Sequence, residues 1–295
     1  MRWILTQIGL CLAALVAALP AYATLRPFQV LDGQVVITVT LNGRDLPALL
    51  DTGATRSLID AAFAKEMGIR SQRAGGGTIG ASGKMIRFGY TQGVMLDIGA
   101  GAKRRRLGTY EAAEPFAPDG VHILIGMDIL DNMAVALDFQ AMTIGIERAV
   151  GFAQPAGEPF KLTRAHWMRP TLSVALGDTE AELVFDTAAS GALHLNTDVV
   201  TRSPELSALP TTRRRIIGID GEHERDAIVI PSVDLGGQTF TNVRASVADM
   251  PLIGKTDMQG IIGVDLMKRF HLVIDFAHDL VWMTPRVSQP GSSAP

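Results

Sequence analysis

The stretch Leu46–Asp60, LPALLDTGATRSLID, places a single carboxylate, Asp51, between an apolar run and a series of small residues. Burying a carboxylate is costly unless other groups pair with it or hydrogen-bond to it. A second stretch, Ala181–Asn196 (AELVFDTAASGALHLN), places Asp186 in nearly the same surroundings. The sequence therefore repeats one unusual local arrangement, an acid at the end of an apolar segment.

The repetition extends over most of the chain. Three further pairs of segments correspond in the same order: Gly80–Lys84 with Gly218–Glu222, Leu96–Gly99 with Val233–Gly236, and Ile123–Phe139 with Gly260–Phe276. One such pair can arise by chance, but several in register indicate duplication. Because internal repeats decide the architecture, two halves of similar structure are predicted.

Each half is predicted to consist mainly of strands. Gln34–Gly43 alternates in polarity and ends on an Asn-Gly turn signal. Arg213–Ile230 has Asp-Gly between two alternating flanks, which is typical of a hairpin. Asp60–Gly68 is predicted as a short helix with an Asp N-cap and a Gly stop. Many glycines and prolines and few long helical patterns also favour an all-β fold, mainly β with short helices.

Residues 1–23 are typical of a secretory signal peptide. Arg2 precedes the apolar run Trp3–Leu19, and Ala21–Ala23 fits a small-x-small cleavage site. An uncleaved membrane anchor is the alternative, but the run is shorter than the ~20 apolar residues that a span requires. We therefore expect an exported protein, periplasmic or secreted, with no membrane contact after signal cleavage.

Composition argues against several kinds of chemistry. The only cysteine, Cys11, lies in the signal segment, so the mature chain is predicted to lack a cysteine nucleophile. The histidines show no metal-ligand spacing, and neither a metal nor a cofactor is expected. The net charge of −3 gives no reason to expect nucleic acid as a partner. The basic runs Lys103–Arg106 and Arg213–Arg215 are predicted as solvated turns or strand ends, with a weak contact to an anionic surface or an acidic substrate as the alternative.

The motif Asp-Thr-Gly-Ala-Thr at 51–55, with the later IGMDIL, resembles the aspartic proteases, and among them the retroviral-type (retropepsin-like) branch. In that family each lobe supplies one Asp-Thr/Ser-Gly loop, and a later apolar pair followed by Gly packs behind it. Ile125-Gly126 and Ile262-Gly263 stand at these positions. The resemblance implies a single-chain, two-lobed bacterial form. It has two pseudo-symmetric retropepsin-like β-barrel lobes with a cleft between them, a monomer with an internal pseudo-dimer.

The predicted division of the chain follows from this resemblance. The segments are a signal peptide (1–23), an N-terminal lobe (24–150), a linker (151–160), a C-terminal lobe (161–286) and a disordered tail (287–295). A third arrangement, in which each half pairs with a second chain, stays open at this stage.

The resemblance also implies the chemistry. Asp51 and Asp186 would face each other across a pseudo-two-fold axis and share one proton, because like charges ~3 Å apart cannot both ionise. The ionised acid would take a proton from a water that attacks the peptide carbonyl. The protonated acid would hydrogen-bond the carbonyl oxygen. The chain is thus predicted to be an exported aspartic endopeptidase that acts on peptides or unfolded proteins.

Further site residues carry roles that the family's motifs imply. Thr52 and Thr187 would hydrogen-bond across the two loops, and Gly53 would let its backbone N–H approach the carboxylate. Thr55 and Ser190 would hydrogen-bond the outer carboxylate oxygens. Two loop tips would form flaps over the substrate: Gly80, Ala81, Ser82 and Gly83 in the first half, and Gly218, Ile219, Asp220 and Gly221 in the second.

The second loop departs from the family at Ala188, where glycine is expected. If the backbone there needs a positive φ, alanine costs on the order of 1 kcal/mol. One interpretation is that the methyl group fits and activity survives. The alternative is a catalytically silent peptide-binding protein on the same fold.

Overall fold

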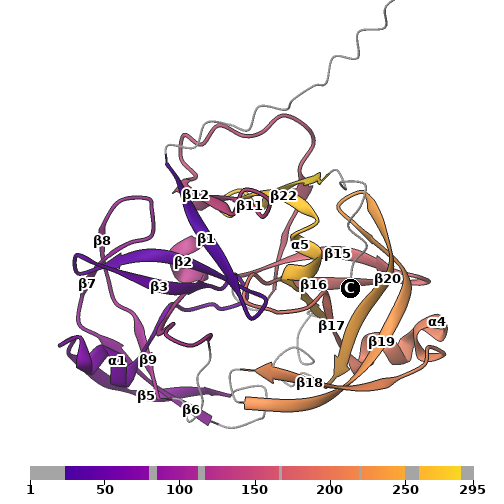
Figure 1. The fold of residues 1–295 in the computed structure, drawn as a ribbon, viewed down its shortest axis with the longest axis horizontal. Helices are drawn as coiled ribbons and strands as arrows, with labels where there is room; N and C mark the ends of the chain where they lie inside the picture. The colour runs from indigo at the N-terminus through magenta and orange to yellow at the C-terminus, as the bar shows by residue number, and fades with distance from the viewer. Residues whose placement is uncertain are drawn as a thin grey trace, which may run out of the picture.

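The computed structural model describes residues 24–79, 85–111, 117–165, 168–218, 221–249 and 259–286. The predicted signal peptide and the predicted C-terminal tail lie outside these ranges. Strands dominate the described chain, and its helices are short, which confirms the predicted all-β class. Figure 1 shows two β-rich lobes, the first in indigo to magenta and the second in orange.

The first half contains the following elements: β1 (Leu25–Leu31), β2 (Gln34–Leu41), β3 (Arg44–Leu50), β4 (Leu58–Asp60), α1 (Ala61–Glu66), β5 (Ser71–Ile79), β6 (Met85–Thr91), β7 (Val94–Asp97), β8 (Lys103–Arg105), β9 (Gly108–Tyr110), β10 (Ile123–Ile125), α2 (Met127–Leu130), β11 (Met133–Asp138) and β12 (Thr143–Arg148). Asp60 caps α1 as predicted, because its side chain accepts a hydrogen bond from Phe63 N at 2.7 Å.

The second half contains these elements: β13 (Phe160–Lys161), β14 (Thr163–Ala165), β15 (Arg169–Leu176), β16 (Thr179–Phe185), β17 (Leu193–Asn196), α3 (Thr197–Arg202), α4 (Pro204–Ser207), β18 (Thr212–Gly218), β19 (Gly221–Leu235), β20 (Gln238–Ala248), β21 (Gly260–Ile262), α5 (Val264–Met267), β22 (Phe270–Asp275) and β23 (Leu280–Pro285). The order of strands and short helices largely repeats that of the first half.

The same strand pairing surrounds the acid in each half. In the first, β10 runs parallel to β3 and antiparallel to β4. In the second, β21 runs parallel to β16 and antiparallel to β17. The strand that precedes each acid therefore lies beside the strand that carries the Ile-Gly element. The duplication predicted from sequence is a duplication of topology.

A shared sheet joins the two halves. Strand β11 pairs antiparallel with β22, with Ala136 opposite Val273. The sheet continues in the order β13-β23-β22-β11-β12-β1 and on into β2 and β3. One large apolar cluster draws buried side chains from both halves. The relative position of the two lobes is therefore fixed by backbone hydrogen bonds and by a common core.

Two hairpins lie on the side of the molecule opposite the shared sheet (Figure 1). The first is β5–β6, and the second is β18–β19, in which Gly218 pairs with Gly221. The remaining predicted flap residues, Gly80, Ala81, Ser82 and Gly83 in the first half and Ile219 and Asp220 in the second, lie outside the described residues. The position of the hairpins fits flaps, and their closure over a substrate stays a prediction.

Candidate active site

Each predicted acid directly follows the last residue of a buried strand. Asp51 follows β3 and donates its N–H to the Ile125 carbonyl at 2.9 Å, and Asp186 follows β16 and donates to Ile262 at 3.1 Å. The Ile-Gly elements therefore hold the backbone at both acids. Both contacts reproduce the packing that the family resemblance implies.

Glycine is required behind each loop because the backbones approach closely. A Cβ at Gly126 would lie 2.8 Å from the Arg56 backbone, and a Cβ at Gly263 would lie 2.8 Å from the Ala189 carbonyl oxygen. Real Cβ atoms do not come this close to the backbone, so a side chain there would push the loop forward. The two glycines thus allow each acid-bearing loop to pack directly against the backbone of the Ile-Gly element, which sets the position of the acid.

The first loop has an additional support that the sequence did not reveal. Asp128, in the first turn of α2, accepts hydrogen bonds at its Oδ1 from Ser57 N (2.8 Å) and Ser57 Oγ (2.6 Å). Gly126 N in turn donates to Ser57 Oγ at 2.9 Å. Asp265, the matching acid of α5, accepts from Lys268 Nζ at 2.6 Å. These two acids stand in the first turns of α2 and α5 but therefore have different partners.

The two motif threonines connect the loops across the molecule. Thr52 N donates to Thr187 Oγ1 at 3.2 Å, and Thr187 N donates to Thr52 Oγ1 at 3.1 Å. Their hydroxyls donate to backbone carbonyls of the opposite half, Phe185 for Thr52 and Leu50 for Thr187. Both threonines are buried. This exchange places the two loops in fixed register, as predicted.

The carboxyl groups of Asp51 and Asp186 meet at the junction of the loops. The Asp51 side chain hydrogen-bonds the Asp186 carboxyl, and Ala188 N donates to Asp186 Oδ1 at 2.8 Å. Ala54 N donates to the Asp51 backbone carbonyl at 3.3 Å, and the N–H groups of Gly53 and Ala54 lower the pKa of the Asp51 carboxyl. Asp51 Oδ1 is buried and has no hydrogen-bond partner among the described residues.

Burial and mutual repulsion make the pair hard to ionise. Burial raises the pKa of Asp51 well above its usual value, and the charge of Asp186 raises it further. Burial also raises the pKa of Asp186, although the Ala188 N–H, the cation Arg169, His194 and the hydrogen bond from Asp51 all oppose the rise. The charge of Asp186 thus disfavours ionisation of Asp51, whereas the hydrogen bond from Asp51 favours ionisation of Asp186. Two such carboxyls share one proton and titrate as a unit.

The hydroxyls of Thr55 and Ser190 do not take the positions expected for them. Neither makes a hydrogen bond to either carboxylate within the part of the chain that the structure describes. Backbone N–H groups of the loops fill that role instead, which the sequence cannot reveal because every residue except proline carries one. Ser190 contributes its carbonyl oxygen, which accepts from His194 Nε2 at 2.6 Å.

Three polar side chains near the dyad were missed by the sequence analysis. Gln34, the first residue of β2, donates from Nε2 to the Ala188 carbonyl at 2.8 Å. Arg169, the first residue of β15, donates from Nε to the Gly53 carbonyl. His194 on β17 hydrogen-bonds Ser246 Oγ through Nδ1 at 2.7 Å. The only feature of the sequence that could have identified two of them is the alignment of the repeats, in which Gln34 and Arg169 begin equivalent strands.

Ala188 fits the second loop without backbone strain. Neither Gly53 nor Ala188 has a positive φ, so the cost considered for alanine does not arise. Its methyl group packs against an apolar cluster of the first half that includes Leu49 and Leu124. The departure from the family motif is therefore accommodated by contacts between the lobes.

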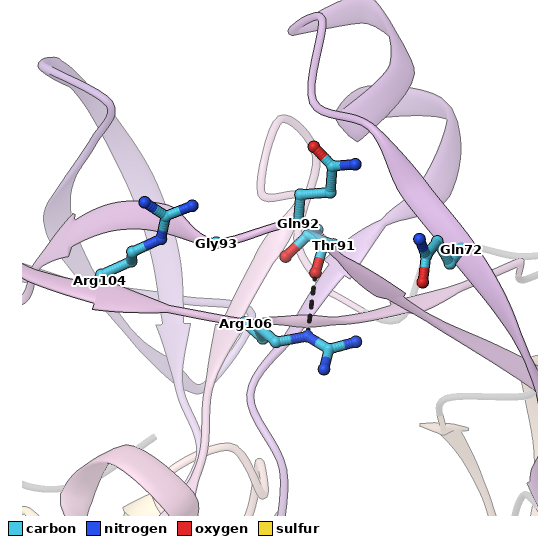
Figure 2. A pocket seen from close by; sticks show the side chains of 6 residues that line it. All are labelled: Gln72, Thr91, Gln92, Gly93, Arg104 and Arg106. Carbon is cyan, nitrogen blue, oxygen red and sulfur yellow. Dashed lines mark hydrogen bonds between the residues drawn. The ribbon is translucent and has the colours of Figure 1, made fainter.

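A separate hollow of about 310 Å³ lies on the first lobe, lined by Gln72, Thr91, Gln92, Gly93, Arg104 and Arg106. Figure 2 shows the guanidinium groups of Arg104 and Arg106 pointing in different directions. Arg106 Nε donates to the Thr91 carbonyl at 3.4 Å, and its guanidinium lies over the Tyr90 ring. The two cations do not converge on one point, so the hollow has no arranged anion site.

The described ranges contain no group of His, Cys, Asp and Glu side chains that could hold a metal ion. No helix in the same part of the chain is both long and apolar enough to cross a membrane.

Comparison with known proteins gives one family match in each half. Residues 37–132 match the model of the gag-polyprotein putative aspartyl protease family, and residues 172–266 match the model of the aspartyl protease family. Each matched region contains one acid-bearing loop and one Ile-Gly element. The structure of EIAV protease complexed with the inhibitor HBY-793 is 24% identical, with 33% of this chain and 85% of that chain covered and a TM-score of 0.27. Among curated proteins, none matches the sequence at a significant level.

Proposed function

We propose that this chain, which belongs to the retropepsin-like aspartyl proteases and has one family domain in each half, hydrolyses peptide bonds with Asp51 and Asp186 as its catalytic pair. The observation that carries the proposal is the contact between the carboxyls of two partly buried acids. Burial of two hydrogen-bonded acids serves no evident purpose in stability, because it costs free energy at any pH at which both would ionise.

The chemistry follows from the shared proton. In the singly ionised pair, the carboxylate takes a proton from a water molecule as the water attacks the scissile carbonyl carbon. The protonated carboxyl donates a hydrogen bond to the carbonyl oxygen, on which negative charge develops. The bonds between Thr52 and Thr187 keep the acids in place, so little reorganisation is needed during the reaction. The substrate would lie extended between the lobes, beneath the hairpins β5–β6 and β18–β19.

The catalytically silent alternative rests on Ala188. Two observations favour an active enzyme: the Ala188 N–H still donates to Asp186, and its φ is not positive. The methyl group therefore leaves the hydrogen bonds of the dyad intact. A silent binder would be expected to lose one of the acids before it lost the glycine.

Export is also part of the proposal. The apolar run Trp3–Leu19 and the site at Ala21–Ala23 support removal of residues 1–23 and a periplasmic or secreted mature protein. Mass spectrometry of the protein from its host would give a mature N-terminus at Thr24. A retained Met1 in a membrane fraction would contradict this and support the anchor alternative.

The activity is tested by incubation of purified protein, beginning at Thr24, with a peptide library from acidic to neutral pH. We expect internal cleavage that pepstatin inhibits and that Asp51→Asn abolishes. Cleavage by the Asp51→Asn variant would refute the dyad. Calorimetric binding of a statine-type inhibitor without turnover at any pH would establish the silent alternative.

A further inference from the structure

The two lobes reach toward the dyad with equivalent side chains of different charge. Gln34 begins β2 and Arg169 begins β15, and these strands occupy matching places in the repeats. Gln34 Nε2 donates to the Ala188 carbonyl, and Arg169 Nε donates to the Gly53 carbonyl. Each side chain therefore crosses to the third residue of the opposite loop. The two contacts are equivalent, but the Gln34 side chain is neutral and the Arg169 side chain is positively charged.

Arg169 is a permanent cation placed beside two acids. It is partly buried, and its charge lowers the pKa of both Asp51 and Asp186. Burial lowers the pKa of Arg169 itself, and the two carboxylates oppose that shift. A guanidinium keeps its charge throughout the pH range of enzymes. Within the described residues Arg169 forms no salt bridge, and the carboxylates whose charges act on it are those of Asp186 and Asp51.

The remaining charged groups around the dyad do not replace this cation. His194 faces Asp186, but burial lowers its pKa, and Arg225 opposes its protonation. Its Nε2–H donates to the Ser190 carbonyl, so in the neutral ring Nδ1 accepts from the Ser246 hydroxyl. The ring is uncharged at neutral pH, and when it is protonated at lower pH it adds to the effect of Arg169 on Asp186.

We propose that Arg169 is a positioning residue that stabilises the singly ionised dyad and holds the Asp51 loop through the Gly53 carbonyl. The inference rests on the proposed function, since it describes how that catalytic pair is kept in its reactive state. The cation is supplied by one lobe only, so the two halves of the pseudo-dimer are not equivalent in the reaction.

The sign of the effect follows from electrostatics. A nearby cation favours the charged form of a carboxyl, so its removal raises the pKa at which the dyad loses its first proton. Activity requires a dyad that has lost this first proton. As the pH falls and the dyad regains the proton, kcat/KM decreases, and this decrease is the acidic limb of the pH profile. In Arg169→Gln, which copies the residue of the other lobe, this limb should move to higher pH by about one unit.

The experiment compares kcat/KM against pH for the wild type, Arg169→Gln, Arg169→Lys and the exchange variant Gln34→Arg/Arg169→Gln. We expect Arg169→Gln to shift the acidic limb upward. Arg169→Lys should keep the limb near that of the wild type because the charge remains, with a lower kcat because Lys cannot reproduce the planar fork. The exchange variant should bring the limb back toward that of the wild type. An acidic limb in Arg169→Gln that coincides with that of the wild type would overturn the inference.

A second readout separates this inference from the proposed function. Protein labelled with ¹³C at the aspartate carboxyls reports the dyad's titration by NMR, whether or not the protein cuts peptides. Asp51→Asn and Asp186→Asn identify the two signals. If the wild type shows no turnover but the signals shift with Arg169→Gln, only the proposed function fails. If the wild type cleaves and the signals do not shift, only the role of Arg169 fails. Thermal unfolding confirms that each variant is folded.

Discussion

Gly53 and Ala188 occupy the third position of the two loops and have different neighbours. A Cβ built at Gly53 would lie 2.5 Å from the Asp186 carboxyl carbon, so the first loop has no space for a methyl group. Ala188 already carries one and packs it against apolar side chains. The loops are therefore not interchangeable, although their motifs differ by a single methyl.

This asymmetry predicts opposite results for two exchanges. Gly53→Ala should reduce kcat/KM by at least about a hundredfold, since the methyl group would displace the Asp186 carboxyl from its reactive geometry. Ala188→Gly should keep activity within a few-fold of the wild type. Steady-state kinetics at the pH optimum measures both, and circular dichroism checks that they fold. Full activity of Gly53→Ala would show that the acids do not have to meet.

The raised pKa values also predict how stability depends on pH. A carboxyl whose pKa is higher in the folded state stabilises the fold below its unfolded pKa, near 3.9, and loses that contribution as pH rises through the folded value. For Asp51, whose pKa is raised, this stabilising contribution is lost as the pH rises above about 4. The native dyad therefore costs stability at neutral pH.

Asp51→Asn should consequently stabilise the protein at pH 7, by on the order of 1 kcal/mol or more, and the gain should shrink toward pH 4. Denaturant unfolding at a series of pH values measures this. Asp265→Asn, a change on the exposed side of α5, serves as the matched control and should show no such gain. A destabilised Asp51→Asn at pH 7 would contradict the account.

At the scale of residues, the sequence predicted the side chains that repeat and missed those that do not. Asp51, Asp186 and the two threonines stand in corresponding motifs. Arg169 and His194 have no charged counterpart in the first half, and Gly53 and Ser246, which they contact, are distant in sequence. Only folding brings them to the dyad. The hydrogen bonds expected from the hydroxyls of Thr55 and Ser190 to the carboxylates are absent among the described residues.

At the scale of elements, the loops after β3 and β16 depend on the two threonine side chains. Removal of the Thr52 hydroxyl would leave the Phe185 carbonyl and the Thr187 N–H without that partner in a buried place. Each unpaired buried group costs about 1–3 kcal/mol. We therefore expect Thr52→Val to lower the free energy of unfolding by about 2–4 kcal/mol.

Thr52→Ser is the matched variant, because it keeps the hydroxyl and removes only a methyl group. It should cost about 1 kcal/mol. Urea unfolding curves of the two variants measure the difference. Equal destabilisation of both would mean that packing of the methyl group, and not the exchange of hydrogen bonds, connects the loops.

Strand prediction succeeded where the polarity pattern was regular. The strand β2 and the hairpin β18–β19 show alternation, and both were predicted. Strand β8 was not predicted, because its residues, Lys103–Arg105, carry charge at every position. It pairs only with β7 among the described strands, and charged side chains are common on such edge strands.

At the scale of the whole molecule, the shared sheet makes the two halves one folding unit. Strands β11 and β22 pair from Ala134 to Asp138 and from His271 to Asp275, and the apolar cluster contains residues of both lobes. Neither half can unfold without breaking this sheet. A single cooperative transition is therefore expected.

Two probes test this cooperativity. Without residues 1–23, the tryptophans of the chain, at positions 167 and 282, both belong to the second half, and Trp282 is buried beside Ala136 and Val273. Far-UV circular dichroism reports strands of both halves. The denaturant midpoints of tryptophan fluorescence and circular dichroism should coincide. Separate midpoints would show that the lobes unfold independently.

The duplication was predictable from the order of the repeated segments, and it led to the correct expectation of two lobes. The joining of those lobes through β11 and β22 was not predictable. Both strands are mainly apolar, and an apolar pattern does not identify a strand's partner. The same limit applies to the contacts of Gln34 and Arg169, which exist only because the shared sheet sets the distance between the lobes.

In the proposed mechanism Asp51 and Asp186 act as one catalytic unit, and kcat/KM of Asp51→Asn, Asp186→Asn and the double variant measures whether they do. Residues that act as a unit are strongly non-additive. Each single variant should therefore lose at least about a thousandfold of the activity, and the double variant should be no worse than either. Retention of substantial activity by one single variant, or losses that multiply in the double variant, would contradict the account.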